Sequence, residues 1–412
     1  MKKRLSVLLA GLILSASVAM AASAPAAPVL SVVKGKIADG IGYTDGGTVF
    51  ATDGLNVYCA FRAPGNTIKM VRSKDGGATW GGAHSIYTSA YDPQTGANGL
   101  DKVSLALSGD AAFPNQKIVH VVWGVDSPNG IYGAKDIYYS WADAANLDAW
   151  STPLRLNGSL TDLDDPAIAV TKAGIIFVKG EFDGKLYLMT SSAHDAGFFT
   201  EPAMIPVSDA GRVAGDAELF VDSSNNLHLS YPYYANAEGS LAGIKYTRLP
   251  AGSSTWSNPV TVFAPSTAGA NHSGLTAYDA NNIYISTIQN GNLTFFSSSN
   301  GGSSWTKKVV FTKTSTLRTD GYSDITVNSS KAITIGSPVV KMATDGTELG
   351  RDTKIYRSTD KGVTWSAATT IPVTGNFISL GVDGNGKVGV LSHSDDNFAV
   401  DGEGVTYFSK EK

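Results

Sequence analysis

From about residue 30 onward, short apolar stretches alternate with polar turns along the chain. Stretches rich in Val, Ile, Tyr, Thr and Phe, such as NTIKMVR (66–72) and GNLTFFS (291–297), are separated by Gly, Asn, Asp and Ser. Alternation of apolar and polar residues at a period of two is typical of half-buried β-strands. No long amphipathic helical pattern follows the first thirty residues. The pattern therefore predicts an all-β protein with many turns.

One eight-residue phrase, here called the repeated turn, occurs three times in related forms. It reads SKDGGATW at 73–80, SSNGGSSW at 298–305 and STDKGVTW at 358–365, and each copy follows an alternating stretch. Looser copies end at Trp150, Phe199 and Trp256, and a seventh alternating stretch ends at the C-terminus. The chain therefore contains seven copies of one strand-and-turn unit.

A second marker supports this count. Each unit opens with a short apolar strand, and the last residues of these strands are 49 to 63 residues apart: Phe50, Leu107, Val170, Val221, Tyr278, Val327 and Val382. A repeat of about fifty residues with about four strands indicates a β-propeller. We predict a seven-bladed β-propeller of four-stranded antiparallel blades. In it, the segment 28–37 (PVLSVVKGKI) supplies the outer strand that the last unit lacks. The alternative is six blades with one unit as an insertion.

The repeated turn resembles the Asp-box, or BNR repeat, of sialidases and related propellers. The copies at 73–80 and 358–365 match it in full, whereas the copy at 298–305 has Asn300 for Asp and Ser304 for Thr. The resemblance implies a turn between the third and fourth strands, at the blade periphery and away from the central site. The side chains expected to have structural roles are Ser73, Asp75, Gly77, Trp80, Ser298, Asn300, Gly302, Trp305, Ser358, Asp360, Gly362 and Trp365.

The N-terminus has the pattern of an export signal. A basic MKKR is followed by the apolar LSVLLAGLILSASV (5–18) and by a small-x-small site at residues 19–21. These features predict a signal peptide over 1–21, a linker over 22–28 and a single propeller domain over 29–412. The apolar run is too short for a membrane span. We therefore expect a secreted or periplasmic protein.

Composition narrows the classes of partner. The formal charge is −4, and removal of Lys2, Lys3 and Arg4 with the signal would make it about −7. A mildly acidic protein does not fit nucleic-acid binding, which needs a basic patch. Cys59 is the single cysteine, and the six histidines are scattered without metal-ligand spacing. We expect no disulfide, no metal and no cofactor; the oligomeric state is left open.

Ligands of propellers usually meet the mouth of the central channel, which the innermost strands and their preceding loops line. The positions five residues before the markers are Asp45, Lys102, Asp165, Asp216, Ser273, Tyr322 and Phe377. Nearby polar residues are Asp101, Asp164, Arg212, Glu218, His272, Arg318, Asp320, Asp324 and Asn376. From this set we predict a ligand-binding group of Asp45, Asp101, Arg212, His272, Arg318 and Asp324. Channel solvation and strand capping are the alternative for each of them.

The resemblance to sialidases implies a specific catalytic set. Those enzymes hold the substrate carboxylate with three arginines and use a Tyr nucleophile assisted by Glu, with an Asp as acid and base. Arg212 and Arg318 can match two of the arginines, and the candidate catalytic residues are Asp165, Asp216, Glu218 and Tyr322. The first arginine is missing, because the first innermost strand reads YTDGGTVF (43–50), and Arg212 precedes Glu218 in reverse of the usual order.

Three hypotheses of function follow. The first is an exported propeller that binds a glycan or another extracellular ligand at the channel mouth. The second is an exo-glycoside hydrolase of the sialidase type. The third is a protein-interaction scaffold of the cell envelope. The incomplete arginine set disfavours the second, and a mouth rich in carboxylates with two arginines disfavours the third.

Overall fold

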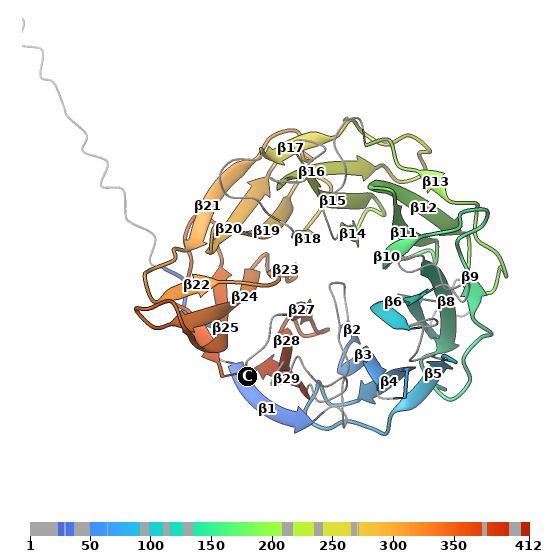
Figure 1. Ribbon diagram of the computed structural model, residues 1–412, viewed down its shortest axis with the longest axis horizontal. Coiled ribbons are helices and arrows are strands. Elements are labelled where there is room, and N and C mark those ends of the chain that lie inside the picture. Colours follow the sequence, from blue (N-terminus) through green and yellow to red (C-terminus); the bar gives the residue numbers. More distant parts are fainter. Residues whose placement is uncertain are drawn as a thin grey trace, which may run out of the picture.

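The computed structural model describes most of the chain. The described residues are 24–28, 30–36, 50–63, 65–90, 99–109, 116–126, 135–207, 217–234, 242–264, 270, 272–372, 377–394 and 405–412. Every regular element among them is a β-strand, and the strands form seven sheets arranged as a ring around a central channel (Figure 1). The predicted all-β, seven-bladed propeller is therefore confirmed.

Blades 1 to 5 each contain four antiparallel strands that follow one another in chain order from the channel outward (Figure 1). Blade 1 comprises β2 (Phe50–Asp53), β3 (Asn56–Ala63), β4 (Thr67–Ser73) and β5 (His84–Thr88). Blade 2 comprises β6 (Leu100–Gly109), β7 (Lys117–Asp126), β8 (Lys135–Asp143) and β9 (Leu154–Arg155). Blade 3 comprises β10 (Asp164–Val170), β11 (Ile176–Phe182), β12 (Lys185–Ser191) and β13 (Ala203–Met204). Blade 4 comprises β14 (Glu218–Val221), β15 (Leu227–Tyr234), β16 (Ala242–Leu249) and β17 (Val260–Phe263). Blade 5 comprises β18 (Gly274–Ala277), β19 (Ile283–Gln289), β20 (Asn292–Ser298) and β21 (Thr306–Phe311).

Blades 6 and 7 depart from this plan. Blade 6 has five strands, because two short strands pair with successive parts of one long strand. They are β22 (Leu317–Thr319), β23 (Asp324–Val327), β24 (Ile333–Met342), β25 (Glu348–Ser358) and β26 (Thr369–Ile371). Blade 7 joins the two ends of the chain, with β1 as its outermost strand. Its strands are β27 (Ile378–Val382), β28 (Val388–Ser394), β29 (Val405–Glu411) and β1 (Leu30–Lys36).

The hydrophobic core lies between the blades. The buried apolar residues divide into seven clusters, and each cluster combines side chains from two neighbouring sheets. The cluster between blades 7 and 1, for example, packs Phe50 and Val71 against Leu391 and Phe408. Lone Cys59 is buried in this cluster, where burial raises the pKa of its thiol to about 12. Because each sheet buries both faces, the ring is held together all the way round.

Local hydrogen bonds define the repeated turns. In the first, the Ser73 hydroxyl accepts the Gly77 N–H at 2.7 Å, and the Asp75 carboxylate accepts the Thr79 N–H at 2.8 Å. Hydrogen bonds from the hydroxyl and N–H of Thr79 lower the pKa of Asp75 to about 2. The same two bonds recur in the other turns, at Ser298 and Asn300 and at Ser358 and Asp360.

Each of these turns also packs against the preceding blade. Its Trp packs edge-on against an aromatic ring of that blade's third strand, with 5.1 to 5.5 Å between ring centroids. The pairs are Trp80 with Phe408, Trp305 with Tyr246 and Trp365 with Phe295. The turns therefore lie at the blade periphery and link one blade to the next. Among the described residues, no helix is long and apolar enough to cross a membrane.

Candidate functional site at the channel mouth

Three of the predicted site residues, Asp45, Arg212 and Asp216, lie outside the described residues. The others lie on the innermost strands or on the loops that lead into them. Glu218 is the first residue of β14, where it pairs in register with Ser230 of β15. The remaining residues form two groups, one on blades 2 and 3 and one on blades 5 to 7.

The first group is a charged network on blades 2 and 3. The Lys135 ammonium binds both Asp101 and Asp164, at 2.9 Å from the Asp164 carboxylate. Lys102, which is 2% exposed, lies 3.7 Å from the Asp165 carboxylate. Asp165 has a φ of 51°, in the left-handed region that non-glycine residues seldom adopt. Three carboxylates and two ammonium groups thus meet where these two blades face the channel.

This network separates the pKa values of its carboxyl groups. Burial, and then the adjacent Asp165, raise the pKa of Asp164 to about 6. Burial also acts on Asp101, but charge and hydrogen bonding from Lys135 outweigh it and lower the pKa of that group. Lys135 thus pairs with two carboxylates whose pKa values are shifted in opposite directions, that of Asp101 downward and that of Asp164 upward.

The second group surrounds a pocket of about 480 Å³ between blades 5 and 6. Its walls come from the turn between β19 and β20, from the connection that follows β21, from β22 and from the loop before β18. The lining residues are His272, Ile288, Asn290, Gly291, Lys313, Arg318, Thr319, Asp320, Gly321 and Ser323. Two predicted ligand-binding residues, His272 and Arg318, are thus brought into one cavity.

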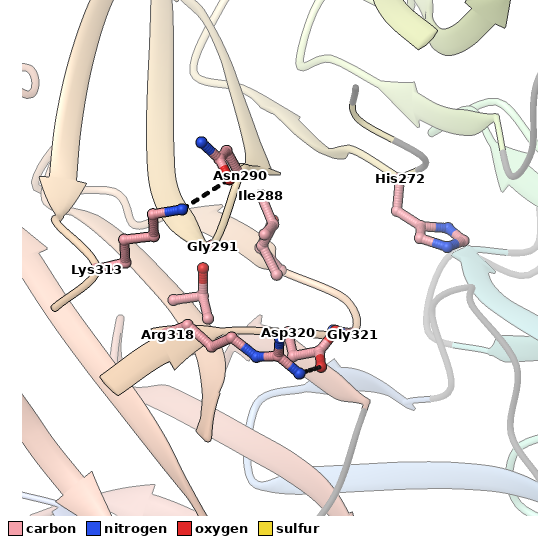
Figure 2. A pocket seen from close by; sticks show the side chains of 10 residues that line it. His272, Ile288, Asn290, Gly291, Lys313, Arg318, Asp320 and Gly321 are labelled. Atoms are coloured by element: carbon pink, nitrogen blue, oxygen red, sulfur yellow. Dashed lines mark hydrogen bonds and ion pairs between the residues drawn. The ribbon is translucent and has the colours of Figure 1, made fainter. Parts of the chain in front are cut away.

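Two cationic side chains lie on one wall of this pocket, and His272 lies apart from them (Figure 2). Lys313 donates to the Asn290 amide oxygen at 2.7 Å, and Arg318 lies 3.3 Å from the Asp320 carboxylate. The side chains of Arg318 and Asp320 are 48% and 43% exposed, so the guanidinium is open to the pocket. Asp320 engages one nitrogen of a fork that carries five donors.

A cluster of three rings, tilted relative to one another, borders the pocket. The ring centroids of His272 and Tyr322 are 3.4 Å apart, and those of Tyr322 and Phe377 are 4.4 Å apart. These residues come from the loops that lead into β18, β23 and β27, the innermost strands of three neighbouring blades. Two residues after Tyr322, the side chain of Asp324 accepts the Leu380 N–H at 2.6 Å, and burial raises the pKa of Asp324 to about 6.

Two cationic residues of the site carry no distinctive signal in the sequence. Lys135 begins the third strand of blade 2, and Lys313 follows the fourth strand of blade 5. Neither holds a fixed position relative to the strand markers. The connection between Phe311 and Asp324 does contain Lys, Arg and Asp together, and that local mixture of charges was the only available hint of a pocket wall.

No protein-family model matches the sequence, and no curated protein matches it either. Solved structures do match the fold. An ulvan lyase from a new family of polysaccharide lyase, bound to -[GlcA(1-4)Rha3S]-, has a TM-score of 0.63 at 11% identity, covering 92% of this chain and 96% of that one. The polysaccharide lyase Uly1 has a TM-score of 0.57 at 10% identity, covering 93% and 98%. The Hadza microbial sialidase Hz136 has a TM-score of 0.51 at 15% identity, covering 83% and 73%. The chain therefore has the sialidase-like β-propeller fold that these glycan-active enzymes share.

Proposed function

We propose that this protein binds an anionic glycan at its channel mouth, in the pocket between blades 5 and 6. The observation that carries the proposal is the wall on which Lys313 and Arg318 lie together, facing a cavity of about 480 Å³. A guanidinium fork matches the geometry of a carboxylate or sulfate group, and an ammonium adds a second positive charge. A volume of a few hundred Å³ is the size of a small-ligand site and suits one or two sugar rings.

The comparisons support a sugar acid as ligand. The ulvan lyase that shares the fold was solved with GlcA and a sulfated rhamnose, so its ligand carries both a carboxylate and a sulfate. The mature protein would itself be acidic, so attraction for such a polymer must come from local cations. Export through the signal peptide over residues 1–21 would bring the protein to extracellular polysaccharides.

One observation favours a further step, cleavage of the bound chain by β-elimination. The reaction needs a cation beside the uronate carboxylate, a base that takes the proton at C5, and an acid that protonates the leaving oxygen at C4. The adjacent side chains of His272 and Tyr322 border the cationic pocket and are of the types that move such protons. The C4–O bond breaks as the C4–C5 double bond forms, so no external oxidant or water is consumed.

The first test is incubation of the protein with uronate-containing, sulfated, sialylated and neutral glycans. Binding is measured by calorimetry, and products are identified by mass spectrometry and by the ultraviolet absorbance of an unsaturated uronate. Binding of acidic but not neutral glycans supports the proposal. An unsaturated product adds the lyase step, whereas release of sialic acid would establish the sialidase-type hydrolase instead. Absence of binding to all of them would overturn the proposal and favour the protein-interaction scaffold.

Substitution of the pocket cations tests the location. Arg318→Gln and Lys313→Gln should each weaken binding of an acidic glycan by about tenfold or more, because a hydrogen bond to a charged group contributes about 1.5–3 kcal/mol. Lys308→Gln is the matched control, since Lys308 lies exposed on β21, an outer strand of blade 5. Equal binding by all three variants would place the ligand elsewhere.

A further inference from the structure

Asp324 lies where the innermost strands of blades 5, 6 and 7 meet. It is the first residue of β23 and follows Tyr322 by two positions. Its carboxylate accepts the N–H of Ile325 at 2.7 Å and the N–H of Leu380, on the innermost strand of blade 7, at 2.6 Å. The second bond crosses from blade 6 to blade 7, the two blades whose Tyr322 and Phe377 rings are in contact.

Blade 5 also packs closely against Asp324, through Gly274 of β18. A Cβ added to Gly274 would lie 2.9 Å from the Cα of Asp324 and 2.7 Å from the Ser286 hydroxyl. The glycine therefore permits a close approach of β18 to β23 that no other residue would allow. The Ser323 hydroxyl donates to Ser286 at 3.2 Å, which adds a polar bond between these blades. Gly274 follows His272 by two positions, so this contact sets how His272 meets blade 6.

We infer that Asp324 is the positioning residue of the candidate glycan site, holding the Tyr322 ring between those of His272 and Phe377 by binding the backbone of blade 7. This inference rests on the proposed function for its biological meaning, but its geometry stands independently. The three rings come from three separate blades, and no covalent path shorter than an entire repeat connects them. Their mutual placement depends on bonds that cross from blade to blade. Blades 6 and 7 are also joined by Asn328 with Gly386 and by Arg357 with Glu411. The bond from Leu380 to Asp324 joins the innermost strands of these blades within three residues of Tyr322 and Phe377.

Blade 2 shows that this bridge does not require a carboxylate. The Ser104 hydroxyl on β6 accepts the N–H of Ile168 on β10 at 3.3 Å, and so links the innermost strands of blades 2 and 3. A neutral hydroxyl thus makes the corresponding bridge on another side of the channel. The bond at Asp324 is shorter, and a carboxylate can bind two N–H groups at once, which fixes the strand more firmly than a hydroxyl does.

A charged carboxylate is energetically unfavourable at this position if its only role is to link two strands. Surrounding protein raises the pKa of Asp324 to about 6, so its charge is disfavoured where it lies. Opposite it in register on β24 is Gly336, and β18, β19 and β27 meet it with Gly274, Ser286 and Leu380, none of which is titratable. Among the described residues, the titratable groups in the loops that lead into β18, β23 and β27 are His272, Asp320 and Tyr322. An acid whose charge is disfavoured, bound to the backbone of blade 7 two residues after Tyr322, supports a role in that site.

A ligand-free experiment tests the positioning directly. The ring C–H resonances of His272, assigned by comparison with His272→Gln, report the nearby Tyr322 ring by NMR. Asp324→Ala should shift these resonances beyond their linewidth, and Asp324→Asn should restore most of the shift, because its amide oxygen can still accept the Leu380 N–H. Ser104→Ala, which removes the corresponding bridge in blade 2, should leave them unchanged. If Asp324→Ala fails to fold, Asp324→Ser copies the arrangement at Ser104 and should give a smaller shift in the same direction.

Glycan affinity is the second measurement on the same variants. Asp324→Ala should bind the acidic glycan at least about tenfold more weakly, and Asp324→Asn should recover most of the affinity. Ser104→Ala should bind as the wild type does, even if it is equally destabilised. Unmoved His272 resonances in a folded Ala or Ser variant would overturn the inference, as would an equal loss of affinity in Ser104→Ala. If the wild-type protein binds no glycan at all, the proposed function fails, and the NMR comparison still decides the positioning role.

Discussion

At the scale of single residues, the repeated turns act as clips between neighbouring blades. The glycine at the fifth position of each turn packs directly against the same aromatic ring that the turn's Trp contacts. In blade 5, a Cβ on Gly302 would lie 2.0 Å from a ring carbon of Tyr246, and the φ of Gly302 is 85°. A glycine is therefore required at position 302 for two reasons: its backbone conformation, and the lack of space for a Cβ atom beside Tyr246.

Gly302→Ala should accordingly destabilise the protein strongly. Overpacking costs about 1–3 kcal/mol, and the left-handed backbone adds about 1–2 kcal/mol for an L-residue. The matched control is Gly346→Ala, because Gly346 has a φ of 88° but no heavy atom within 4 Å of the added Cβ. Denaturant unfolding should show the backbone cost alone in the control and the larger sum in Gly302→Ala. Equal losses in the two variants would show that the clip contributes nothing.

At the scale of elements, two departures from a regular blade shape the molecule. In blade 6, β24 and β25 extend beyond β23, and β22 pairs with that extension, with Arg318 opposite Val340. This extra pairing fixes the strand that carries Arg318 as a wall of the pocket. In blade 7, β1 pairs with β29 in antiparallel register, with Leu30 opposite Glu411. A strand from the N-terminus therefore covers the edge that the last strand of the chain would otherwise expose.

Removal of β1 should weaken the whole ring. A variant that begins at residue 37 loses the outer strand of blade 7, whereas a control that begins at residue 28 keeps it, together with the Pro28 carbonyl that accepts the Thr369 hydroxyl. We expect the midpoint of thermal unfolding to fall by at least several degrees in the first variant and to be unchanged in the control. The exposed edge of β29 should also promote association, which light scattering would detect. A shorter variant as stable and monodisperse as the control would contradict this account.

At the scale of the whole molecule, stability depends on polar groups buried between the blades. His120 is fully buried, with its ring nitrogens 2.8 Å from the Ser108 hydroxyl and 2.9 Å from the Tyr139 hydroxyl. Burial, and then the nearby His194, lower its pKa from 6.5 to about 3. A histidine whose pKa falls on folding stabilises the native state above its unfolded pKa. That contribution is lost as the pH falls from about 6.5 towards 3.

His120→Gln should therefore flatten the pH dependence of stability on the acid side. The free energy of unfolding of the wild-type protein contains a slope of about 1.4 kcal/mol per pH unit from this group between about pH 6 and 3, and the variant lacks it. Asp164 and Asp324, with pKa values raised to about 6, act in the opposite sense, since their contribution is lost as the pH rises from about 4 to 6. The difference between wild type and variant isolates His120. His84→Gln, on the outer strand β5, controls for the loss of a histidine. Parallel curves for wild type and His120→Gln would refute the argument.

The sequence by itself determined the class of fold and the place of the turns, and it favoured seven blades over six. These features are visible because each is written within one repeat of about fifty residues: a strand pattern, a Ser–Asp hydrogen-bonding phrase and a Trp at fixed spacing. The candidate residues near the innermost strands could also be counted off from the markers. His272, Arg318 and Tyr322 were found in this way, and the structure brings them to one pocket and its border.

Only the tertiary structure decided which of these residues meet. Lys135 reaches Asp164 from a different blade, and Lys313 shares a wall with Arg318 because an additional strand pairs with β24. Asp324 meets Leu380 across 56 residues of chain. Side chains on successive blades are a full repeat apart in sequence, so no local spacing encodes their contact. The closure of the ring, which places seven such repeats around one channel, is what makes them a site.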